Sequence, residues 1–146
     1  MIAPTWMPIA LRELGVTETP GPEHTLRILE YHRATDGDAD EVTDELPWCS
    51  SFVCWVMTRA GLLSTRSKAA RSWLVWGAAV EPQYGAVAVF SRGQSWQGHV
   101  GFCIDLDSAR VWIVGGNQGN SVSVVAYPRG RLLSFRWPAA VGGQIA

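Results

Sequence analysis

The 146-residue sequence has almost no excess charge, because 12 Lys and Arg stand against 13 Asp and Glu and leave a net charge of −1. Without a basic stripe, nucleic acid is not expected as a partner. No segment approaches the roughly 18 consecutive apolar residues that a membrane helix needs. Residues 1–8 also lack the basic start and the apolar core of a secretory signal. We therefore expect no membrane insertion and no signal peptide.

Cysteine is scarce as well. The three cysteines, Cys49, Cys54 and Cys103, form no tight even-numbered framework, so we expect reduced thiols rather than a disulfide scaffold. Cys103 and His99 share a strand face but supply only two ligands, which is too few for zinc. The acidic stretch Asp36 to Glu45 lacks the glycine and the final acid of a calcium loop. No metal or cofactor is expected.

What is present is typical of a globular protein. The apolar fraction of 47% and the length predict one domain, residues 1–146, with a real hydrophobic core. Apolar residues recur at helical spacing before Gly77, whereas short apolar runs bounded by turns follow Glu81. This order predicts an α+β fold, with a helical part over about 4–77 packed on an antiparallel sheet over about 84–138.

The periodicity also predicts the individual elements. Helices are expected over 6–14 and 23–34, from Pro47 to Ala60, and over 69–76. Asp105 to Ser108 is expected to be a turn between two strands. The expected strands are residues 86–90, 99–104, 111–114, 121–126 and 133–137.

Cys49 falls in the first turn of the third expected helix, which should cross the core. Backbone N–H groups and the helix dipole favour negative charge there, so the position favours a thiolate and an oxyanion. His99 begins a strand and is a candidate general base on a different element. Asn117, at the end of the next strand, is a candidate to orient the imidazole. The alternatives are a small buried cysteine, a structural histidine and an ordinary turn asparagine.

Tryptophan is abundant, with eight residues, and most should lie in the core. Trp48 and Trp96 differ, because each adjoins an expected catalytic element in a polar setting. Their rings could stack on a sugar or a peptide, or simply pack around the rim of a cleft. They are candidate substrate-binding residues.

Several motifs together resemble the CHAP group of cysteine, histidine-dependent amidohydrolases/peptidases, within the NlpC-type papain-like superfamily. The resemblance covers nearly the whole chain and is closest to a small single-domain subgroup of phage and bacterial genomes. Its motifs are Trp48 to Phe52, Gly98 to Gly101, Gly115 to Gln118, Glu13 to Val16, Ile28 to Tyr31, Ala70 to Trp73 and Arg136 to Pro138.

The resemblance implies a papain-like fold and cleavage of a peptidoglycan amide bond. Cys49 matches the nucleophile, His99 the base and Asn117 the third polar residue, with Gln118 beside it as a further candidate for substrate binding. Two positions depart from the family pattern. Gly85 is followed by Ala86 rather than an aspartate, and Gly115 stands where many members carry a glutamate, which gives no support to calcium binding.

We therefore hypothesise a peptidoglycan amidase or endopeptidase that acts through an acyl-enzyme and is expected to be monomeric. The scissile bond is either the sugar–peptide junction or a bond within the stem peptide. Without a signal peptide, the protein would be made in the cytoplasm. It would reach the wall through a phage holin, as a virion enzyme, or as a secreted toxin with an immunity protein as its partner. The rival hypotheses are an inactive wall-binding module and a cytosolic thiol amidase.

Overall fold

Helices occupy the first half of the described chain and strands the second, as the sequence predicts. The computed structural model describes residues 3–19, 25–37, 47–141 and 144–145. The helices are α1 (Trp6–Leu11), α2 (Leu26–Arg33) and α3 (Cys49–Arg59), with 3-10 helices η2 (Ala70–Val75) and η3 (Arg129–Arg131). The strands are β1 (Ala78–Ala79), β2 (Val87–Ser91), β3 (Gly98–Leu106), β4 (Arg110–Gly115), β5 (Ser123–Pro128), β6 (Leu132–Trp137), β7 (Ala140–Val141) and β8 (Gln144–Ile145). The α+β class is confirmed.

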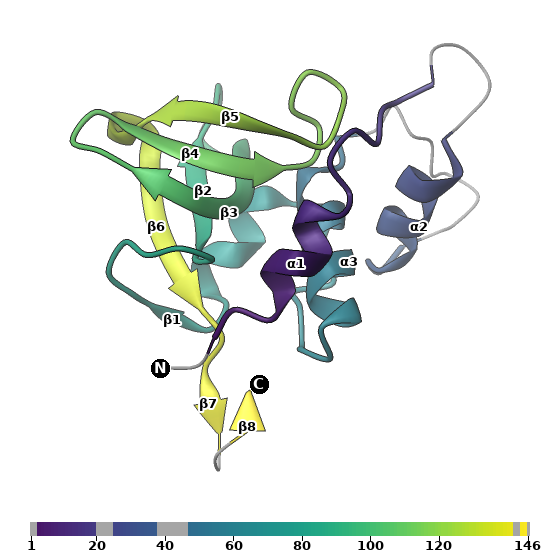
Figure 1. Cartoon of the computed structure of the whole chain (residues 1–146), viewed down its shortest axis with the longest axis horizontal. Coiled ribbons are helices and arrows are strands. Elements are labelled where there is room, and N and C mark those ends of the chain that lie inside the picture. Colours follow the sequence, from purple (N-terminus) through teal and green to yellow (C-terminus); the bar gives the residue numbers. More distant parts are fainter. Residues whose placement is uncertain (1–2, 20–24, 38–46, 142–143, 146) are drawn as a thin grey trace.

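The strands of the main sheet run in the order β1-β6-β2-β3-β4-β5, and every pair is antiparallel. β7 and β8 form a separate pair near the C-terminus. Figure 1 shows the sheet on one side of the molecule and the helices on the other, with α2 packed on α3 at the far edge. The expected arrangement, helices on one antiparallel sheet, is therefore present.

Helix α3 is the centre of the core. All residues from Cys49 to Met57 are buried, and Phe52 packs edge-on against Phe102 of β3. The helix begins at Cys49 with Trp48 as its N-cap, two residues after the predicted start at Pro47. Cys49 is consequently the first residue of the helix, at the end where backbone N–H groups lack intrahelical acceptors.

Other boundaries differ from the prediction for local reasons. Helix α1 ends at Leu11 rather than Leu14, because the N–H groups of Glu13 and Leu14 bond three residues back in tighter turns. The segment 69–76 is a 3-10 helix rather than an α-helix. Strand β3 continues through Leu106, so Asp105 lies within the strand, and the turn is held by Asp107, whose carboxylate accepts from Ala109 and Arg110.

Short or irregular elements escaped the sequence patterns. The two-residue strands β1, β7 and β8 were not predicted, and β5 covers residues 123–128 instead of 121–126. Residues 23 and 24 of the second expected helix lie outside the described residues. Over the described ranges, no helix is both long and apolar enough to cross a membrane.

Candidate active site

Cys49 lies where the start of α3 meets the start of β3. Its side chain is only 5% exposed, and the backbone N–H groups of Val100 and Ser50 lower the pKa of its thiol, which places the beginning of β3 close to it. Val100 follows His99 directly on β3. The helix start and the strand start therefore meet, although 50 residues separate them in the sequence.

His99 is buried in β3, opposite Phe90 of β2. Its Nε2 atom lies 2.8 Å from Oε1 of Gln118 and 3.2 Å from the hydroxyl oxygen of Tyr127. The Tyr127 ring also packs against the imidazole, with 4.9 Å between the ring centroids. The imidazole is thus held on one nitrogen and on one face.

The hydrogen bonds of Gln118 determine which imidazole nitrogen carries the proton. Its amide nitrogen donates to the carbonyl oxygens of Ile113, at 3.2 Å, and Ser123, at 2.7 Å. Because both partners only accept, the amide oxygen must face His99, and it accepts the proton on Nε2. The neutral imidazole then presents the lone pair of Nδ1, which is the form that a general base requires.

This geometry corrects the expected orienting residue. The sequence predicts that Asn117 holds the imidazole, but the hydrogen bond comes from Gln118, which is 4% exposed and was expected to bind substrate. Asn117 has a left-handed backbone, with φ of 59°, and its side chain lines the adjacent pocket. Asparagine tolerates this conformation better than most residues, and it turns the chain so that Gln118 lies beside His99.

Gly115 explains why Gln118 can occupy this place. A Cβ atom on residue 115 would lie 2.6 Å from Oε1 of Gln118 and 3.5 Å from Nε2 of His99. The space that a side chain at position 115 would enter is therefore filled by the Gln118 amide. A glycine at position 115 is therefore needed for Gln118 to contact His99, because a glutamate there would occupy the same space.

Burial sets the charge states of the pair. Desolvation raises the pKa of the Cys49 thiol, although the N–H groups of Val100 and Ser50 and the charge of Arg92 oppose this shift. Desolvation also lowers the pKa of His99 to about 4, against the effect of Gln118 and together with the charges of Arg92 and Arg131. Burial thus favours the neutral forms of the thiol and the imidazole, whereas the N–H groups at the helix start favour the thiolate.

A pocket of about 210 Å³ opens beside His99. Its lining includes two arginines that the sequence analysis missed, Arg92 after β2 and Arg131 before β6, together with Tyr127 of β5. These residues carry no local motif, and pairing of the strands brings them to His99. No sequence pattern therefore identifies them as site residues, and only the folded structure does.

The two tryptophans proposed to bind substrate have different environments. Trp48 is completely buried, stacks on Tyr31 with 5.8 Å between centroids, and donates from Nε1 to Glu18. It is a core residue, and its ring has no exposed face on which a substrate could stack as the sequence analysis proposed. Trp96 is 72% exposed in the loop between β2 and β3, so its role in binding stays a prediction.

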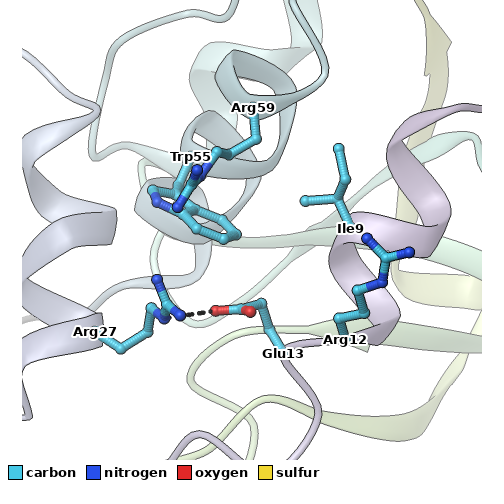
Figure 2. Close-up of a pocket in the computed structure, with 6 residues that line it drawn as sticks. All are labelled: Ile9, Arg12, Glu13, Arg27, Trp55 and Arg59. Carbon is cyan, nitrogen blue, oxygen red and sulfur yellow. Dashed lines mark ion pairs between the residues drawn. The ribbon is translucent and has the colours of Figure 1, made fainter.

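A second pocket, of about 290 Å³, lies among the helices (Figure 2). Arg27 pairs with Glu13 at 3.1 Å, and the guanidinium groups of Arg27 and Arg59 lie over the Trp55 ring. Arg12 and Ile9 of the α1 region complete the lining (Figure 2). No cysteine or histidine lines this pocket, so it is separate from the candidate active site.

The remaining candidate ligands can be compared with a metal centre only where the structure describes them. Within the described ranges, no three His, Cys, Asp or Glu side chains are placed to hold a metal ion. Asp38, Asp40 and Glu41 of the acidic stretch lie outside those ranges. Cys54 and Cys103 are buried free thiols, and Nδ1 of His32 forms a hydrogen bond of 2.8 Å with the Ser51 hydroxyl.

Comparison with protein-family models finds a match over the middle of the chain. The model of the CHAP domain matches residues 41–117, slightly more than half of the chain, and the match includes Cys49 and His99. A search of curated proteins finds no match.

Proposed function

The chain belongs to the CHAP domain family, whose members are generally amidases or peptidases, and from this premise we propose that it hydrolyses an amide bond of bacterial peptidoglycan. In this proposal Cys49 is the nucleophile, His99 is the base and Gln118 is the residue that positions the base. The supporting observation is the chain of hydrogen bonds from Ser123 through Gln118 to His99, which leaves Nδ1 of His99 as the acceptor.

The reaction proceeds by general base catalysis. As the sulfur of Cys49 attacks the carbonyl carbon, its proton passes to Nδ1 of His99, and the imidazolium is stabilised by Gln118. The negative charge on the carbonyl oxygen is stabilised by N–H groups at the start of α3. The imidazolium then protonates the leaving nitrogen, the C–N bond breaks, and a thioester remains on Cys49.

Deacylation repeats the proton transfers with water. His99 takes a proton from a water molecule that attacks the thioester carbonyl, and the tetrahedral intermediate expels the sulfur of Cys49. The proton returns from His99 to the sulfur. The products are a carboxylic acid and an amine, and the enzyme regains its neutral thiol and imidazole.

Digestion of purified sacculi tests the proposal. Wild-type protein should release soluble muropeptides with new amino groups, Cys49→Ala should release none, and Cys54→Ala should retain most of the activity. Cys54 is a matched control because it is a buried thiol on the same helix, bonded to the Ser67 carbonyl at 3.7 Å. Mass spectrometry of the products identifies the bond that is cleaved.

The rival functions give different results in the same experiment. A wall-binding module would sediment with sacculi and release nothing, whereas a thiol amidase with another substrate would leave sacculi untouched. Equal release by wild type and Cys49→Ala would show that Cys49 is not the nucleophile.

A further inference from the structure

The pocket beside His99 carries a concentrated positive charge. Arg92 and Arg131 both line it, and none of its lining residues is acidic. Neither arginine forms an ion pair with an acidic side chain in the described part of the chain. Both arginine charges act on the active site, since both contribute to lowering the pKa of His99.

The two arginines are held differently. Arg131 is anchored, because its Nε and one terminal nitrogen donate to the carbonyl oxygen of Ser91 at 3.0 and 2.9 Å. Its guanidinium also lies 5.9 Å from the centre of the Tyr127 ring. Arg92 is exposed, and its side chain forms no hydrogen bond with any residue that the structure describes. One cation is therefore fixed, and the other has all its donors available.

Tyr127 adds a neutral donor. Burial, and then the nearby Cys49, raise the pKa of its hydroxyl to about 12, so the hydroxyl keeps its proton at neutral pH. Its oxygen lies 3.2 Å from Nε2 of His99, which carries a proton, so this oxygen accepts and the Tyr127 proton is available to a ligand. Two guanidinium groups and a hydroxyl thus surround one small space beside His99, and Cys49 is near enough to act on the pKa of Tyr127.

From this arrangement we infer that Arg92, Arg131 and Tyr127 bind a free carboxylate of the substrate, next to the amide bond that is cleaved. Guanidinium groups match carboxylates with charge-assisted hydrogen bonds, and the burial of His99 and the partial burial of Tyr127 limit competition from water. The inference rests on the proposed function and narrows it: the substrate is a peptide with an unamidated carboxylate near the scissile bond, as in a stem peptide that has not been amidated.

Carboxylate removal from the substrate is the direct test. Sacculi are treated with carbodiimide and ammonia, which converts free carboxylates into carboxamides, and initial rates are compared with those on untreated sacculi. Loss of a hydrogen bond to a charged group should reduce the wild-type kcat/KM by about 10-fold to 100-fold on the amidated material. Raising the salt concentration should narrow this difference because the pair is partly exposed.

Variants assign the effect to the pocket. Arg92→Gln should lower kcat/KM much more on untreated sacculi than on amidated sacculi, and so lose most of the discrimination. Arg92 is preferred to Arg131 for this purpose because Arg131 also ties β6 to β2 through Ser91. Arg12→Gln is the matched control, since Arg12 is an exposed arginine in the second pocket (Figure 2) and should retain full discrimination.

The outcomes separate this inference from the proposed function. Equal wild-type rates on both substrates, or an equal loss by Arg92→Gln on both, would overturn the carboxylate site while leaving the hydrolase intact. If wild type digests neither substrate, the proposed function fails. Binding of the Cys49→Ala protein to sacculi, measured by co-sedimentation, then tests the carboxylate site by itself. Binding to untreated sacculi that is weakened by amidation and by Arg92→Gln supports the carboxylate site, and binding unaffected by either change refutes it.

Discussion

Gln118 Oε1 lies 2.8 Å from Nε2 of His99, while the amide nitrogen of Gln118 is bonded to two backbone carbonyls. The amide can therefore neither rotate away nor present its nitrogen to the imidazole without losing bonds. Through this contact, a residue with no charge decides the protonated nitrogen of a buried histidine. Several predictions about catalysis depend on it.

Gln118→Ala should reduce kcat by about 10-fold to 100-fold, because His99 loses the acceptor that fixes its tautomer and its orientation. Asn117→Gly, which keeps the left-handed backbone at φ 59°, should cause a smaller loss. The measurement is muropeptide release by the two variants, with circular dichroism as a control for folding. A larger loss for Asn117→Gly would return the orienting role to Asn117.

Gly115 and Gln118 should show strong coupling. Gly115→Glu alone should be poorly active, because its Cβ would lie 2.6 Å from Oε1 of Gln118. In the Gln118→Ala background, the Gly115→Glu side chain can occupy the space left by the Gln118 amide, and its carboxylate then lies near Nε2 of His99. The double variant should therefore be more active than Gln118→Ala, and a double-mutant cycle of rates measures the coupling. Additive losses would contradict the shared space.

Alkylation of Cys49 should be slow at neutral pH and accelerate as the pH rises. Burial raises the pKa of this thiol, and only the thiolate reacts. Cys103, whose pKa burial raises to about 11, should also react only under alkaline conditions. Peptide mass spectrometry after timed iodoacetamide exposure reports each site. Rapid modification of Cys49 at about pH 6 would indicate a resting thiolate–imidazolium pair instead.

His99 should make folding sensitive to acid. Its pKa falls from 6.5 to about 4 on folding, mainly through desolvation, so between these values the unfolded chain binds a proton that the folded protein does not. The free energy of unfolding is therefore unaffected by the protonation of His99 above pH 6.5. It decreases as the pH falls toward 4, by on the order of 3 kcal/mol. Urea unfolding at pH 7 and pH 4.5 should show a smaller pH dependence for His99→Gln than for wild type. Identical dependence would exclude this contribution.

The sequence predicted most of the local structure correctly. Pro47 and the spacing of apolar residues within α3 place the helix within two residues of its observed start. The buried run of β2 and the placement of His99 at the start of β3 were also correct. These features depend on neighbours within a few positions, which a single sequence displays.

The errors share a different cause. Trp48 precedes Cys49 in a polar segment, yet it is buried because Tyr31 of α2 and Glu18 provide a stack and an acceptor from distant parts of the chain. Asn117 and Gln118 are equally polar neighbours, and only the position of His99 and the carbonyls of Ile113 and Ser123 decides between them. A linear pattern contains no information about these distances.

The sequence by itself thus determined the order of helices and strands. It also determined that Cys49 lies at the start of a helix and that His99 lies at the start of a strand. The tertiary structure alone decided that Gln118 orients His99, and that Tyr127, Arg92 and Arg131 surround it. The physical reason is the range of the interactions. Helical and strand periodicity is set by adjacent residues, whereas hydrogen bonds and charge act on side chains that only strand pairing brings within a few ångströms.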